Sequence, residues 1–181
     1  MAEAELPPEP ELEPVAAEED EDERPPRTIE AWLIATFAGV GFLPWMPGTW
    51  GSLATVLLWA LAAHYLRPEL QFAVAMGVVC VAIIAGIPAA SIVCRETEKK
   101  DPQIVVIDEV AGQMITLLLV PLGWKAFLAG FILFRAFDML KPFPVRRLES
   151  LPEGSGVVMD DVGAGLYGFL VMQLLLHFHV V

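Results

Sequence analysis

Residues 71 to 94 read QFAVAMGVVCVAIIAGIPAASIVC, which is a run of 24 residues without a single charge. A helix that crosses the hydrocarbon core of a bilayer needs roughly 20 mostly apolar residues, so this stretch predicts a membrane-spanning helix. Three further apolar regions lie at residues 52–66, 110–134 and 162–181. We therefore expect an all-α, multi-helical bundle that is integral to a membrane and has about four apolar helical regions.

The charges of the chain are concentrated at its beginning. The formal net charge is −12, and residues 1–30 contain twelve of the 23 acids but only two bases, Arg24 and Arg27. Residues 1–28 are also rich in Pro and Ala, with no apolar periodicity, which is typical of a disordered segment. The sequence thus predicts a disordered acidic tail over 1–28 and one helical membrane domain over 29–181.

The apolar region 110–134 has two interpretations. It contains Pro121-Leu122-Gly123-Trp124-Lys125, where Pro and Gly favour a break and a lysine would be costly in mid-membrane. A single kinked span would put five bases on each side of the membrane. A hairpin would leave only Arg67 and Lys125 on one side and nine bases on the other. Because cytoplasmic loops are enriched in Lys and Arg, the hairpin is favoured, and the polar segments between helices are expected to face the cytoplasm.

Five carboxylates lie at the edges of these apolar regions. They are Asp108, Glu109, Asp138, Asp160 and Asp161. Clustered like charges are unfavourable unless a cation or a proton offsets them, and Mg²⁺ prefers carboxylates, water and substrate phosphate as ligands. The alternative is helix capping, because acids also stabilise helix N-termini. A cap explains one acid in each adjacent pair but not both, so Mg²⁺ binding is the favoured hypothesis.

Two cations accompany Asp138. Arg135, Asp138 and Lys141 are spaced i, i+3 and i+6, which places them on one face of a helix. Lys141 precedes Pro142, so it should mark the end of that helix. Such a face suits a site that holds metal and phosphate together, although a surface ion-pair ladder would have the same spacing.

A glycine-rich segment precedes the helix expected over 52–66. It reads Pro47-Gly48-Thr49-Trp50-Gly51-Ser52, and a turn of this kind exposes backbone N–H groups that suit a phosphate. Thr49 and Ser52 add hydroxyl groups. Ordinary helix capping is the alternative.

Four blocks of the chain together resemble the phosphatidylglycerophosphatase A family. They are Gly39-Val40-Gly41 with Pro47–Leu53, then Val106–Gln113, then Phe134–Pro144, and then Gly156–Gly165. They occur in the family's order and cover the chain from about Thr36 to Tyr167. The acidic tail departs from the family pattern, and Glu153-Gly154-Ser155 stands where a more glycine-rich turn is expected.

The resemblance implies an enzyme of the bacterial inner membrane that hydrolyses phosphatidylglycerophosphate to phosphatidylglycerol and phosphate with Mg²⁺. The expected partners are this lipid and the bilayer, with the active site at the cytoplasmic membrane surface. Metal ligands are expected among Asp108, Glu109, Asp138, Asp160 and Asp161, which together with Lys141 form the expected catalytic set. Substrate contacts are expected from Thr49, Ser52, Arg135 and Arg146.

Two alternative functions belong to other classes of protein. A CDP-alcohol phosphatidyltransferase also uses Mg²⁺ carboxylates at a membrane surface, but its longer run of spaced Asp, Gly, Ala and Arg residues does not follow Asp108. A non-enzymatic divalent-cation-binding membrane protein should carry acids inside its spans, whereas here the acids lie at the edges. Nucleic-acid binding is disfavoured because the bases are few and are matched by acids. The sequence indicates no oligomeric state.

Overall fold

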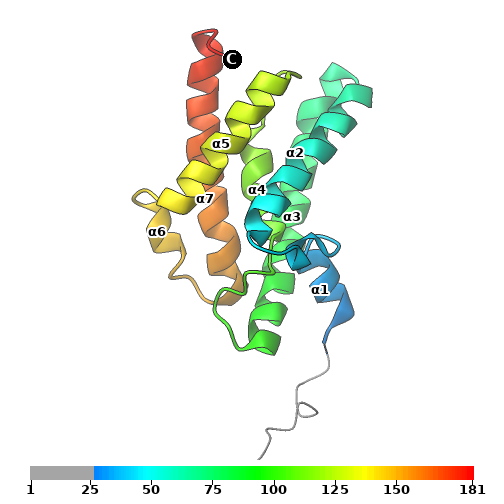
Figure 1. The fold of residues 1–181 in the computed structure, drawn as a ribbon, viewed down its shortest axis with the longest axis vertical. Coiled ribbons are helices and arrows are strands. Elements are labelled where there is room, and N and C mark those ends of the chain that lie inside the picture. Colours follow the sequence, from blue (N-terminus) through cyan, green and yellow to red (C-terminus); the bar gives the residue numbers. More distant parts are fainter. Residues whose placement is uncertain (1–26) are drawn as a thin grey trace, which may run out of the picture.

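A computed structural model describes residues 27–181, and in that range the chain is entirely helical. The elements are α1 (Ile29–Ala35), the 3-10 turn η2 (Val40–Phe42), α2 (Pro47–Tyr65), α3 (Pro68–Thr97), α4 (Ile107–Thr116), α5 (Trp124–Leu140), α6 (Val145–Leu148) and α7 (Glu153–His177) (Figure 1). The predicted all-α class is therefore confirmed. The tail predicted over residues 1–28 lies outside the described residues, apart from Arg27 and Thr28.

Prolines begin two consecutive helices of the chain. Pro47 and Pro68 each stand in the first turn of a helix, α2 and α3 respectively, where the missing N–H has no helical partner to lose. α3 contains the uncharged stretch 71–94 and is 30 residues long, or about 45 Å at 1.5 Å per residue. The residue that caps the C-terminus of α3 is Glu98, which adopts a left-handed conformation.

The apolar region 110–134 forms two helices. α4 ends at Thr116, the chain turns, and α5 begins at Trp124, so the break falls at the predicted Pro-Gly segment. In Figure 1, α4 and α5 run antiparallel beside each other. The hairpin prediction is confirmed, and it brings the start of α4 and the end of α5 to the same end of the pair.

α4 is the central helix of the bundle, since all its residues from Ile107 to Thr116 are buried. It packs most extensively against α7, through glycines. A Cβ on Gly165 would lie 2.4 Å from the carbonyl oxygen of Gly112, and one on Gly112 would lie 2.5 Å from the carbonyl oxygen of Asp161. Small residues that allow such close backbone approach are typical of helix interfaces in membranes. The contact fixes Asp161 beside the first turns of α4.

The expectation of about four membrane-crossing regions is corrected by the structure. Among the described residues, two helices are long and apolar enough to cross a membrane, α3 and α7. α4 has 10 residues and α5 has 17, so at 1.5 Å per residue both are shorter than the roughly 30 Å hydrocarbon core. α2 has 19 residues but is not among the helices that are both long and apolar enough to cross a membrane.

Candidate active site

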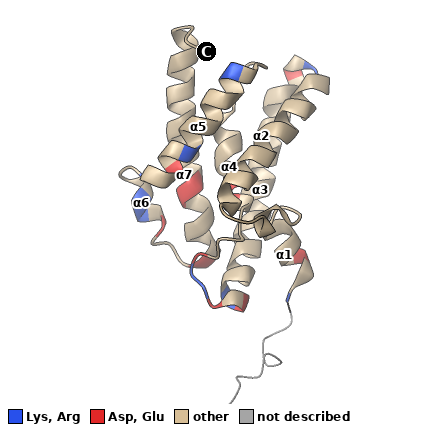
Figure 2. Cartoon of the chain, in the orientation of Figure 1, with Lys and Arg blue, Asp and Glu red and all other residues tan. Residues whose placement is uncertain are grey.

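One cleft collects the acids predicted from the sequence. It has a volume of about 280 Å³ and lies where the first turns of α2 and α4 meet the last turns of α5 and the first half of α7. Seven of the predicted site residues line it: Asp108, Glu109, Arg135, Asp138, Lys141, Asp160 and Asp161. In Figure 2 charged segments of α5 and α7 lie at a similar level of the bundle.

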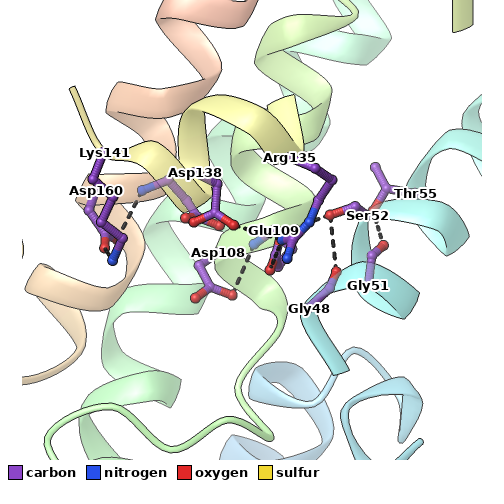
Figure 3. Close-up of polar contacts among 11 residues, drawn as sticks. Gly48, Gly51, Ser52, Thr55, Asp108, Glu109, Arg135, Asp138, Lys141 and Asp160 are labelled. Atoms are coloured by element: carbon purple, nitrogen blue, oxygen red, sulfur yellow. Dashed lines mark hydrogen bonds and ion pairs between the residues drawn. The ribbon is translucent and has the colours of Figure 1, made fainter. Parts of the chain in front are cut away.

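Glu109 lies at the centre of the polar contacts (Figure 3). Its carboxylate accepts a hydrogen bond from Arg135 Nη1 at Oε1 (2.6 Å) and another from Ser52 Oγ at Oε2 (2.7 Å). Burial raises the pKa of Glu109, while the positive charge of Arg135 and the two hydrogen bonds oppose that rise. Each oxygen of Glu109 is thus fixed by a separate donor, and the carboxylate has one defined orientation.

Arg135 connects α4 with α5. Its Nη1 lies 2.6 Å from Glu109 Oε1 and 2.8 Å from Asp138 Oδ2, and its side chain is 13% exposed. Within residues 27–181 these contacts to acids run through Nη1 alone. Because a guanidinium has five N–H donors, Arg135 retains donors for a further anion in the cleft.

Lys141 connects α5 with α7. It follows the last residue of α5 in a left-handed conformation, so the predicted helix end is confirmed. Its Nζ lies 2.7 Å from Asp160 Oδ2 and 3.6 Å from Glu149 Oε1. Burial lowers the pKa of Lys141, but the hydrogen bond and charge of Asp160 outweigh burial and raise it above its usual value. Lys141 therefore carries a positive charge at neutral pH.

Asp108 and Asp161 differ from the other acids of the cleft. They are 9% and 4% exposed, and in the described part of the chain no base lies within ion-pair distance of either one. Burial and the neighbouring charge of Glu109 raise the pKa of Asp108 well above its usual range. A buried carboxylate without a cation is unfavourable, so this pair of side chains suits a bound cation.

The donor set fits Mg²⁺ in its chemistry. Among residues 27–181 no group of three or more acidic, His or Cys side chains is arranged so that it could hold a metal ion by itself. Mg²⁺ does not require such a group, because it usually keeps several waters and is held by one or two carboxylates together with substrate phosphate. Asp108 and Asp161 supply two buried oxygen donors, and the other acids of the cleft lie around them.

Three of the residues predicted to contact the substrate have a different position or partner in the structure. Thr49 is half-buried in the first turn of α2, and Arg146 is exposed on α6, and neither lines the cleft. Ser52 is fully buried and donates to Glu109, with Gly48 O as a second acceptor at 3.0 Å. Ser52 therefore orients a carboxylate in this structure, where the sequence suggested a direct phosphate donor.

The cleft also contains residues that the sequence did not single out. Asp101 and Gln103 reach it from the loop between α3 and α4, and Trp45 and Met46 reach it from the loop before α2. The sequence did offer a signal for Asp101, because this acid lies three residues before the apolar run Ile104–Ile107 that leads into Asp108. For Trp45 and Met46 the only signal was their position just before the glycine-rich segment.

Comparison with known proteins points to one family. The family model described as phosphatidylglycerophosphatase A matches residues 33–176. A phosphatidylglycerophosphatase A of Escherichia coli is 33% identical over 151 residues, covering 80% of this chain and 83% of the relative. One of Haemophilus influenzae is 35% identical over 142 residues, covering 77% and 85%.

A third bacterial relative carries a different name. A protein of Bacteroides thetaiotaomicron, provisionally named as a phosphatidylinositol-3-phosphatase, is 41% identical over 147 residues, covering 78% of this chain and 91% of its own length. No solved structure matches the chain significantly.

Proposed function

This chain belongs to the phosphatidylglycerophosphatase A family and is a phosphatase, and from that premise we propose that it hydrolyses phosphatidylglycerophosphate to phosphatidylglycerol and inorganic phosphate with Mg²⁺. The observation that supports this proposal is the cleft itself. Asp108 and Asp161 are buried carboxylates that have no base partner among residues 27–181, and they line the same cavity as two cations, Arg135 and Lys141. A divalent metal ion would offset the two carboxylates, and the phosphate would contact the two cations.

Arg135 and Lys141 would bind the phosphate. A phosphomonoester carries close to two negative charges near neutral pH, and both cations are held beside the cleft by acids on other helices. Arg135 has donors left after its contacts through Nη1, and its planar fork suits phosphate oxygens. Both side chains are partly desolvated, which strengthens their interaction with charge that develops on the phosphate during hydrolysis.

Asp108 and Asp161 are the residues that would hold Mg²⁺, with Asp138, Asp160 and Glu109 around them. When bound, Mg²⁺ supplies positive charge to the phosphate oxygens. One carboxylate that is not engaged by the metal would accept a proton from the attacking water. Ser52 and Arg135 would keep Glu109 oriented throughout, since each binds one of its two oxygens.

The same proposal includes a cellular location for the enzyme. α3 and α7 are long and apolar enough to cross a membrane, and the relatives are bacterial. We place the enzyme in the bacterial inner membrane as a multi-pass protein, with its cleft at the cytoplasmic surface. The excess of Lys and Arg in the loops at the cleft end supports this orientation.

The test is phosphate release by the purified full-length chain in detergent micelles. Phosphatidylglycerophosphate and phosphatidylinositol 3-phosphate are compared at matched concentrations, because the Bacteroides relative carries the second name. We expect faster release from phosphatidylglycerophosphate, loss of release with a chelator, and recovery with excess Mg²⁺. Faster release from the inositol lipid would refute the substrate assignment, and release that resists the chelator would refute the metal assignment.

A matched pair of variants connects the assay with the cleft. Asp161→Asn should remove most of the turnover. Glu69→Gln should keep it, because Glu69 is exposed and pairs only with Arg67 in the described structure. Equal turnover in the two variants would contradict the placement of the site.

A further inference from the structure

The rim of the cleft on the α2 side is apolar and exposed. Residues 42–46 connect η2 to α2, and Phe42, Leu43, Trp45 and Met46 are 58%, 43%, 95% and 53% exposed. We refer to these four residues as the apolar rim. Trp45 and Met46 also line the cleft that contains the acids. The rim is thus part of the wall of the candidate active site, and its exposed apolar surface requires an explanation.

The exposure of Trp45 is imposed by a backbone that is held in place. Trp50 Nε1 donates to the carbonyl oxygen of Pro44 (3.1 Å), and the backbone N–H of Met46 donates to the same oxygen (3.2 Å). Trp45 itself has a φ of 81°, a conformation that is unusual for a bulky residue and persists only where the surrounding structure imposes it. The loop therefore presents the indole outward at the mouth of the cleft.

The two sides of the cleft have opposite character. The α5 and α7 side carries Arg135, Lys141 and their partner acids, whereas the rim before α2 carries no charge (Figure 2). Phosphatidylglycerophosphate has the same division, since its head group carries a terminal phosphomonoester and a phosphodiester, whereas its two acyl chains are apolar. With the phosphate beside Arg135 and Lys141, the glycerol backbone and the acyl chains have the apolar rim as their complementary surface.

We propose that Trp45, supported by Met46, contacts the glycerol backbone and first acyl carbons of the lipid substrate and selects long-chain phosphomonoesters over short-chain ones. This inference rests on the proposed lipid phosphatase function and assigns a specificity-determining role to a residue outside the charged cluster. Tryptophan suits this position, because its ring is apolar while its N–H tolerates the wet head-group layer.

The experiment compares two substrates with the same head group. Turnover of dioleoyl and of dihexanoyl phosphatidylglycerophosphate is measured in the same detergent for the full-length wild type, Trp45→Ala and Trp45→Phe. We expect the ratio of kcat/KM between the long and the short substrate to fall about tenfold in Trp45→Ala, equivalent to about 1.4 kcal/mol. The loss should appear in KM for the dioleoyl lipid, and Trp45→Phe should restore most of the ratio.

Trp124→Ala is the matched control. Trp124 is 74% exposed at the start of α5, whereas the cleft residues of α5 lie in its last turns. It should leave the substrate ratio unchanged. An unchanged ratio in Trp45→Ala, or an equal fall in both alanine variants, would overturn the proposal.

A binding measurement keeps this test separate from the proposed function. Quenching of tryptophan fluorescence is titrated with phosphatidylglycerophosphate brominated near the start of its acyl chains, and in parallel with brominated phosphatidylcholine. We expect a quenched component specific to the phosphomonoester that is absent in Trp45→Ala and present in Trp124→Ala. Equal quenching by the two lipids would refute selection by Trp45, whatever the turnover is. Specific quenching without phosphate release would support the contact and contradict the proposed reaction.

Discussion

Replacing Gly48 by alanine tests the geometry of the cleft with one added carbon. A Cβ at this position would lie 2.0 Å from Glu109 Oε1, 3.0 Å from Glu109 Cδ and 3.3 Å from Arg135 Nη1. Gly48 lies in the first turn of α2, where alanine is otherwise the better helix former. Any harm from the substitution must therefore come from this contact.

The size of the effect follows from these distances. Ordinary van der Waals contact begins at 3.4 Å, so the carboxylate oxygen must retreat by about 1.4 Å from its 2.0 Å position. Oε1 accepts from Arg135 and Oε2 from Ser52, so the movement breaks at least one of these hydrogen bonds. A hydrogen bond to a charged group contributes about 1.5–3 kcal/mol, and a misplacement of about 1 Å in an active site can lower the rate about 10²-fold.

We therefore expect Gly48→Ala to lower kcat by about 10²-fold and to lower Tm moderately. For a chain of this size Tm falls by about 2–4 °C per kcal/mol. Both quantities are measured on purified protein in the same detergent, with phosphate release as the activity assay. Gly77→Ala is the control, because a Cβ at Gly77 meets nothing within 4 Å, and its turnover and Tm should match or exceed those of the wild type.

Two results would refute this reasoning. Near-normal turnover in Gly48→Ala would show that the orientation of Glu109 is unimportant or that the carboxylate moves freely. A loss of turnover that only follows unfolding, with the remaining folded enzyme fully active, would show that Gly48 acts on stability alone.

Three further predictions follow from the charges of the cleft. Asp108→Asn should abolish most turnover without lowering Tm, since it removes a buried carboxylate that has no base partner in the described part of the chain. Mg²⁺ should raise the Tm of the wild type but not of this variant, and an equal rise in both would exclude Asp108 as a ligand. Lys141→Met should lower turnover by about 10²–10³-fold and should also lower Tm, because Asp160 loses its 2.7 Å partner. The double variant with Asp160→Asn should regain the Tm of the wild type but not its turnover. Recovery of both quantities would make Lys141 purely structural. In a background without the native cysteines, labels at positions 100 and 150 should react from the same side of the membrane, and opposite sides would contradict a single site.

The sequence predicted the helical class, the hairpin and the acids that line the cleft, because these depend on local patterns. An uncharged run as long as 71–94 seldom forms any structure other than a helix. The Pro-Gly break at 121–123 marks the turn between α4 and α5. The spacing and the following proline predicted a helix that carries Arg135 and Asp138 and ends at Lys141. In the structure Arg135 and Asp138 lie on α5, and Lys141 directly follows its last residue. All three line the cleft.

Only the tertiary structure decided which partners these residues have. Ser52 and Glu109 are 57 residues apart in the chain, and their hydrogen bond depends on how closely α2 packs on α4. The glycine contacts between α4 and α7 likewise bring Asp161 to Asp108. Composition and periodicity do not report such contacts, because they describe one helix at a time.

The same reason explains which residues the sequence misplaced or missed. Thr49 and Arg146 have suitable side chains close in sequence to the site, yet the packing of α2 and α6 leaves both outside the cleft. Trp45 and Asp101 enter it because the loop before α2 and the loop before α4 both border the cleft. The sequence by itself determined the helices and their charged ends, and the close packing of those helices determined which charged ends form one site.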